Sequence, residues 1–191
     1  MCCVAALLAA GWAAPSLAAE PPESVREIVQ TCASCHGQEG VSAIENTPSL
    51  AGQPDIFLQY QLVFIRDGVR KVEVMQEFAK KLTDADIRDL GAYYSSLPPP
   101  PPQDAVRKVD DKAVTELIVP RHCDSCHKPD FSGQGESARL AGQRPEYLVK
   151  ALSDFRSGAR RGRGLGAMIE VSSTLHEEDM QMIAAWLARK P

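Results

Sequence analysis

Two five-residue strings of the form Cys-x-x-Cys-His constrain this 191-residue chain more than any other feature. Two thiols three positions apart lie on one helical turn, where they can add to the two vinyl groups of a haem and form thioethers. The histidine that follows then lies under the iron as the proximal ligand. The spacing therefore predicts two covalently attached c-type haem groups. The predicted attachment and proximal residues are Cys32, Cys35, His36, Cys123, Cys126 and His127.

Other uses of paired cysteines account for the pattern less well. A thioredoxin-like redox pair belongs to a βαβ context and needs no histidine after it. Pairs that share one zinc ion usually lie about 15 to 20 residues apart, and these two lie much further apart. Structural disulfides would suit an exported protein, but they do not explain a histidine at the same offset twice.

The first 19 residues are apolar and rich in alanine, and they end in Leu17-Ala18-Ala19 before Glu20. This pattern is typical of a secretory signal peptide, and it is too short for a membrane-spanning helix. No Lys or Arg precedes the apolar run, so a retained membrane anchor is the alternative. We expect residues 1–19 to be a signal peptide that exports the chain to the periplasm, with membrane association possible if it is not cleaved.

The rest of the chain contains an internal duplication. The string Leu-Ala-Gly-Gln at 50–53 recurs at 140–143, and Arg-x-Gly-x-Arg at 66–70 recurs at 156–160. One haem motif precedes each copy. The repeat predicts two domains, at 20–97 and 110–191.

A linker at 98–109 separates the two predicted domains, and it begins with five consecutive prolines. Five prolines cannot form a helix or a central strand. As polyproline II they would span about 15 Å. We interpret this segment as a stiff spacer that sets the geometry between the domains.

Apolar residues recur at helical spacing around both motifs. One such stripe leads into Cys32, and another covers 54–66. Thr83 is the expected N-cap of a last helix in the first unit. The second unit repeats the pattern over 147–155 and 180–187, and no convincing strand pair is present. We therefore expect an all-α protein whose two small units are each completed by a covalently attached haem.

Two methionines are the predicted sixth ligands of the irons. Met75 lies 39 residues after His36, and Met168 lies 41 residues after His127. Each also precedes the repeated leucine of the last helix by 7 residues. Met75 is expected in the loop between the last two helices. A His/Met pair raises the reduction potential of a haem. The predicted iron ligands are His36, Met75, His127 and Met168.

Other candidates for the sixth position are weaker. Lys80 or Lys81 could replace Met75 only when deprotonated, so we expect that only at alkaline pH. Met180 and Met182 fall on the predicted last helix, where Met180 belongs to the apolar face. The remaining histidines are His122, directly before Cys123, and His176, near the start of the last helix.

The order of these motifs resembles the class I cytochrome c fold, and its duplication resembles the di-haem cytochrome c4 family. The resemblance implies two class I cytochrome c domains with haem c at both motifs and His/Met iron ligands in each. It also implies a periplasmic electron carrier, not an enzyme, that takes electrons from a quinol-oxidising complex or a dehydrogenase towards a terminal oxidase. The cytochrome subunit of flavocytochrome c sulfide dehydrogenase is similar too, and it is the alternative.

The two copies differ at positions that matter for haem binding. In family members a proline carbonyl commonly orients the proximal histidine, and Pro48 matches that position. The second copy has Ala138 there, so we expect its carbonyl to be less firmly placed. The second copy also has Lys128 where the first has Gly37. These differences predict two non-identical haems.

Charge distribution adds one hypothesis about partners. Residues 20–100 carry 12 acidic and 7 basic side chains, whereas 101–191 carry 13 and 14. Nothing in this composition suggests nucleic-acid binding. A basic cluster precedes Met168, and it could steer docking to an acidic partner. Its members are Arg156, Arg160, Arg161 and Arg163.

Overall fold

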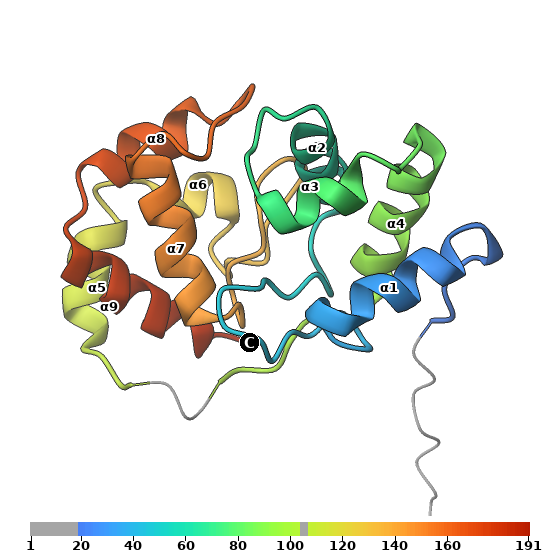
Figure 1. The fold of residues 1–191 in the computed structure, drawn as a ribbon. Helices are drawn as coiled ribbons and strands as arrows, with labels where there is room; N and C mark the ends of the chain where they lie inside the picture. The colour runs from blue at the N-terminus through green and yellow to red at the C-terminus, as the bar shows by residue number, and fades with distance from the viewer. Residues whose placement is uncertain (1–18, 104–106) are drawn as a thin grey trace, which may run out of the picture.

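The computed structural model describes residues 19–103 and 107–191 (Figure 1). The predicted signal peptide lies outside these residues except for Ala19, and 104–106 of the predicted linker lie outside them too. Every regular element in the described part of the chain is helical, and the one β-bridge, between Gln134 and Ser137, is isolated. The all-α prediction is confirmed. None of the helices described here is long and apolar enough to cross a membrane.

The first half of the chain forms the right-hand lobe in Figure 1. Its elements are the 3-10 turn η1 (Glu23–Val25) and the helices α1 (Arg26–His36), α2 (Asp55–Arg66), α3 (Glu73–Ala79) and α4 (Asp84–Ser96). Helix α2 packs against α4. Thr83 caps α4 as predicted, because its hydroxyl accepts from the Asp86 N–H while the Asp86 carboxylate accepts from the Thr83 N–H.

The second half forms the left-hand lobe in Figure 1. Its elements are α5 (Asp111–Ile118), α6 (Cys123–His127), α7 (Pro145–Arg156), α8 (Gly166–Ser173) and α9 (Glu177–Ala188). Helix α9 packs against both α5 and α7. The N-cap of α9 is His176, which is exposed and forms a capping box with Asp179.

Each half has its own hydrophobic core. In the first, Val25, Leu58 and Leu90 are buried together. In the second, Met180 and Ile183 belong to one cluster that surrounds α9. The predicted boundaries at 20–97, 98–109 and 110–191 stay a proposal, and the two separate cores support it.

The haem-motif helix differs between the halves. In the first half α1 runs unbroken into His36, whereas in the second the chain leaves α5 and starts α6 again at Cys123. Pro120 stands where the first half has the buried helical residue Val29. Because proline has no N–H to donate and its ring clashes with the preceding turn, the helix cannot continue there. His122, with φ of 49°, then redirects the chain into α6.

Four polar side chains meet where the halves touch. Arg70 and Arg160, which are equivalent in the repeat, both donate to Gln61 Oε1, at 2.8 Å and 2.9 Å. Arg70 also donates to the Tyr147 hydroxyl at 3.2 Å. Burial alone would raise the pKa of Tyr147, but the two guanidinium groups lower it to about 8. The second Arg of each Arg-x-Gly-x-Arg string is therefore part of the contact between the lobes.

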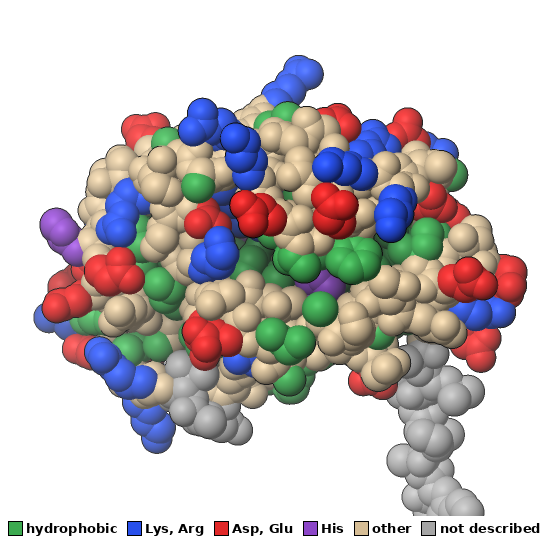
Figure 2. All heavy atoms as spheres, viewed as in Figure 1, with side chains coloured by type: hydrophobic (Ala, Val, Ile, Leu, Met, Phe, Trp, Pro, Cys, Tyr) green, Lys and Arg blue, Asp and Glu red, His purple; other side chains and the backbone are tan. Residues whose placement is uncertain are grey.

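This contact corrects the hypothesis of a basic docking cluster. Arg160 is only 5% exposed and donates to residues of the other half and of α7, so it cannot meet a partner protein. Arg156 donates to the Leu175 carbonyl and to Glu177, where it supports the start of α9. Arg156, Arg161 and Arg163 are exposed, but Arg156 is already paired with Glu177. Figure 2 shows Lys and Arg interspersed with Asp and Glu over both lobes on the face in view.

The proline-rich segment runs below the two lobes in Figure 1, and Pro99 lies next to Gly52 of the first half while Pro100 lies next to Gly142 of the second. At its end, the Gln103 N–H donates to the Ala188 carbonyl at 2.9 Å, and its side-chain amide donates to the Gly142 carbonyl at 3.0 Å. The segment is thus held by the second half and does not project freely into solvent.

Candidate haem-binding sites

The structure places both Cys-x-x-Cys-His strings on helices, as their spacing predicts. Cys32 and Cys35 lie in the last turns of α1, which ends at His36, and Cys123–His127 make up the whole of α6. The first cysteine of each pair is half-buried and the second is exposed, and all four are free thiols. Each motif therefore presents two thiols and one imidazole from a single stretch of helix.

Both proximal histidines are buried and held by one backbone carbonyl. The distance from His36 Nδ1 to the Pro48 carbonyl oxygen is 2.8 Å, and that from His127 Nδ1 to the Ala138 carbonyl oxygen is 2.7 Å. Burial lowers the pKa of both imidazoles, which favours the neutral ring. A neutral ring that donates through Nδ1 keeps a lone pair on Nε2, which is the form that binds a metal.

The Ala138 carbonyl reaches its histidine as closely as the Pro48 carbonyl does, without a proline at that position. That it is less firmly placed stays a prediction. The loop that carries each carbonyl is closed by a pair of backbone hydrogen bonds. The Gly40 carbonyl accepts from the N–H groups of Leu50 and Ala51, and the Phe131 carbonyl accepts from those of Leu140 and Ala141. The same closure in both halves makes the proline unnecessary for aiming the carbonyl.

Met75 and Met168 are each the third residue of a short helix, α3 and α8, and both are half-buried. The prediction of a loop position for Met75 is therefore wrong. The segment Glu73–Ala79 contains neither Pro nor Gly, so nothing in it opposes a helical turn. That these two methionines ligate iron stays a prediction.

The alternative ligands lie in places that suit other roles. Met180 is fully buried in the second core, where its sulfur accepts a hydrogen bond from Ser153. Met182 is partly buried on α9. The remaining alternative ligands are all exposed, and they are Lys80, Lys81, His122 and His176.

Large apolar side chains in the segment that follows the first motif remain exposed. Of the large hydrophobic residues that are exposed in the described chain, most lie between His36 and Lys80. They are Ile44, Ile56, Tyr60, Val69, Val74 and Phe78. Figure 2 also shows hydrophobic side chains gathered in the middle of one face, between the lobes. Thiols, a neutral imidazole and a thioether form the donor set that a haem c group requires, so the residues present fit it.

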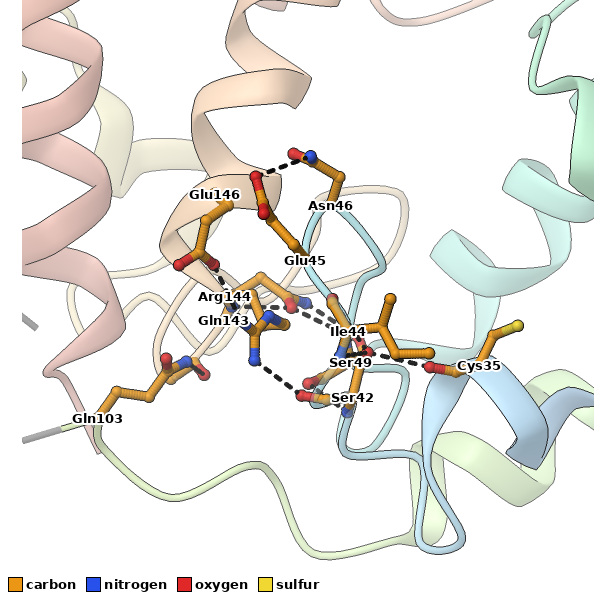
Figure 3. Close-up of polar contacts among 11 residues, drawn as sticks. Cys35, Ser42, Ile44, Glu45, Asn46, Ser49, Gln103, Gln143, Arg144 and Glu146 are labelled. Atoms are coloured by element: carbon orange, nitrogen blue, oxygen red, sulfur yellow. Dashed lines mark hydrogen bonds and ion pairs between the residues drawn. The ribbon is translucent and has the colours of Figure 1, made fainter. Parts of the chain in front are cut away.

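Two glutamines of the repeated Leu-Ala-Gly-Gln strings connect the sites across the lobes. Gln143 forms two hydrogen bonds with the backbone of Ser49, as Figure 3 shows, and Gln53 forms two with the backbone of Arg139. All of these groups are buried. The sequence indicated this string as a marker of the repeat and of the family resemblance, and it assigned the glutamines no contact of their own. Its exact recurrence next to each proximal loop was the signal that it has a structural role.

A protein-family model described as "Cytochrome C oxidase, cbb3-type, subunit III" matches residues 19–93. The thiosulfate dehydrogenase electron acceptor of Thiomonas intermedia (strain K12) is 36% identical over 98% of this chain and 89% of its own length. Cytochrome c4 of Azotobacter vinelandii is 32% identical, and the match covers 82% of each protein.

A solved structure, that of reduced recombinant cytochrome c4 from Pseudomonas stutzeri, is similar over both lobes. It superposes with a TM-score of 0.75 at 29% identity, over 88% of this chain and 98% of that chain. These similarities cover both halves of the chain.

Proposed function

The chain belongs to the di-haem cytochrome c4 family, and on that premise we propose that it carries electrons between periplasmic redox proteins through two haems, each with His and Met as iron ligands. Members of this family are electron-transfer proteins with covalently bound haem c, and this chain is an electron-transfer protein and not an enzyme. The observation that carries the proposal is the repeated site. In both halves, a buried neutral histidine bonded to a carbonyl directly follows two free thiols on a helix.

We assign the residues as follows. Cys32 and Cys35 bind one haem, and Cys123 and Cys126 bind the other. The ligand pairs are His36 with Met75 and His127 with Met168. A bound haem supplies an iron that cycles between ferric and ferrous forms. The chain's own residues hold the proximal ring in one tautomer and surround the site with apolar groups.

The name of one relative supports a thiosulfate-oxidising dehydrogenase as the electron donor. The Thiomonas intermedia protein is named a thiosulfate dehydrogenase electron acceptor, and its similarity extends over nearly the whole chain. As the electron donor, this similarity favours a thiosulfate-oxidising dehydrogenase over a flavocytochrome dehydrogenase and over a quinol-oxidising complex. The proposed electron acceptor is a terminal oxidase. Rapid reduction of the oxidised protein by thiosulfate and catalytic amounts of such a dehydrogenase would support the assignment. Reduction that is no faster than without the dehydrogenase would contradict it.

A spectroelectrochemical titration of the haem-loaded protein tests the proposed ligands. We expect two one-electron waves at positive potential, both accompanied by the weak far-red band of methionine-ligated ferric haem. The waves should differ in midpoint, because the proximal loops differ at Gly37 and Lys128. A single low-potential wave, or one haem without the far-red band, would contradict His/Met ligation at that haem.

A further inference from the structure

We propose that Gln53 and Gln143 are positioning residues that act across the boundary between the lobes, each on the proximal histidine of the opposite half. The inference rests on the proposed function to the extent that His36 and His127 ligate iron. It concerns how the chain's own residues set the strength of those two ligands.

The first connection runs through the peptide group between Pro48 and Ser49. Its carbonyl oxygen accepts from His36 Nδ1 at 2.8 Å. The N–H of the same peptide group donates to Gln143 Oε1 at 2.8 Å, and Gln143 Nε2 donates back to the Ser49 carbonyl at 2.9 Å. Gln143 is 1% exposed and Ser49 is 2% exposed, so water does not compete for these bonds.

The second connection repeats the arrangement in the opposite direction. The carbonyl of the peptide group between Ala138 and Arg139 accepts from His127 Nδ1 at 2.7 Å. The N–H of that group donates to Gln53 Oε1 at 3.0 Å, and Gln53 Nε2 donates to the Arg139 carbonyl at 2.9 Å. Each histidine is therefore separated from a glutamine of the other half by one peptide group.

A peptide group transmits this effect because its N–H and C=O share one delocalised electron system. An acceptor at the N–H moves electron density towards the carbonyl oxygen, and hydrogen bonds in such a chain strengthen one another, the more so in a buried, low-dielectric setting. A stronger acceptor at Nδ1 makes the imidazole a better electron donor to a metal. A better donor stabilises the oxidised iron, so each glutamine lowers the reduction potential of the haem in the opposite half.

The test is a pair of crossed substitutions in the haem-loaded protein. Gln143→Leu should raise the midpoint potential of the haem bound at Cys32 and Cys35 and leave the other unchanged. Gln53→Leu should do the reverse. We expect about a threefold change in the reduction equilibrium, which is about 28 mV for one electron. Each wave is assigned to its haem through the NMR signals of the haem methyl groups.

NMR of the reduced protein supplies a readout that does not depend on electron transfer. The Nδ1–H resonance of His36 should move in Gln143→Leu, and that of His127 should move in Gln53→Leu. Gln143→Glu keeps an acceptor oxygen for the Ser49 N–H, so it should not raise the potential of the first haem. If Gln143→Leu fails to accumulate with haem, Gln53→Leu tests the proposal on its own.

Tyr147→Phe is the matched control, because it removes the hydrogen bond from Arg70 between the lobes without touching either peptide group. It should move neither Nδ1–H resonance. The proposal is overturned if potentials change in the half that carries the substitution, or if both haems shift alike in every variant including the control. Failure of the His/Met assignment is seen separately, as a missing far-red band in the unsubstituted protein.

Discussion

Replacing Met75 with His should lower the midpoint potential of the first haem by a few tenths of a volt, because axial ligands tune haem potentials over about 0.8 V. A thioether is a soft ligand that favours ferrous iron, whereas imidazole is a stronger donor that favours ferric iron. Met75 is half-buried on α3, so the exchange does not disturb either core. The spectroelectrochemical titration should show one wave moved to low potential and half of the far-red band lost.

The repeat supplies controls for this experiment. Met168→His should produce the same change at the second haem, because Met168 occupies the same place on α8. Met182→His, at a partly buried position on α9, should leave both waves in place. If Met75→His left both waves and the far-red band unchanged, Met75 would not be the ligand, and Lys80 and Lys81 would be the next residues to test.

Gly37→Ala should reduce the free energy of unfolding of the first half by about 3 kcal/mol or more, because two penalties add. Gly37 has φ of 84° and ψ of 154°, a backbone conformation that is almost exclusive to glycine. A Cβ there would also lie 2.1 Å from the Val41 carbonyl oxygen. Denaturant unfolding, followed at the absorbance of each haem, measures the change half by half.

The second half already carries this strain. Lys128, the equivalent of Gly37, has φ of 68° and ψ of 160°. Lys128→Gly should therefore stabilise the second half by about 1 kcal/mol, after the entropy cost of the new glycine is subtracted. Gly135→Ala is the control, because its φ is also positive but no atom lies within 4 Å of the added carbon. If Gly37→Ala and Gly135→Ala reduced the free energy of unfolding of their halves by the same amount, the prediction of an added cost from the contact with Val41 would be wrong.

The features that the amino-acid sequence determined by itself depend on residues that are close together in the chain. The Cys-x-x-Cys-His strings specify haem attachment because one helical turn brings the thiols and the imidazole together. The Thr83 cap and the helical stripes depend on neighbours within a few residues, and they were predicted correctly. The family resemblance identified the Pro48 carbonyl as the one that faces His36, and the repeat transferred that role to Ala138. The break before α6 is explained by Pro120, which ends the preceding helix.

Only the tertiary structure decided which of the repeated residues face the other half. Arg160 reads as a surface charge in a basic run, yet it is buried against Gln61. Gln53 and Gln143 read as markers of a duplication, yet each bonds to the backbone beside the opposite histidine. Periodicity and motif spacing describe contacts within one helix or loop. The contacts between the lobes depend on how two separately folded surfaces meet, and that arrangement joins residues about ninety positions apart in the chain.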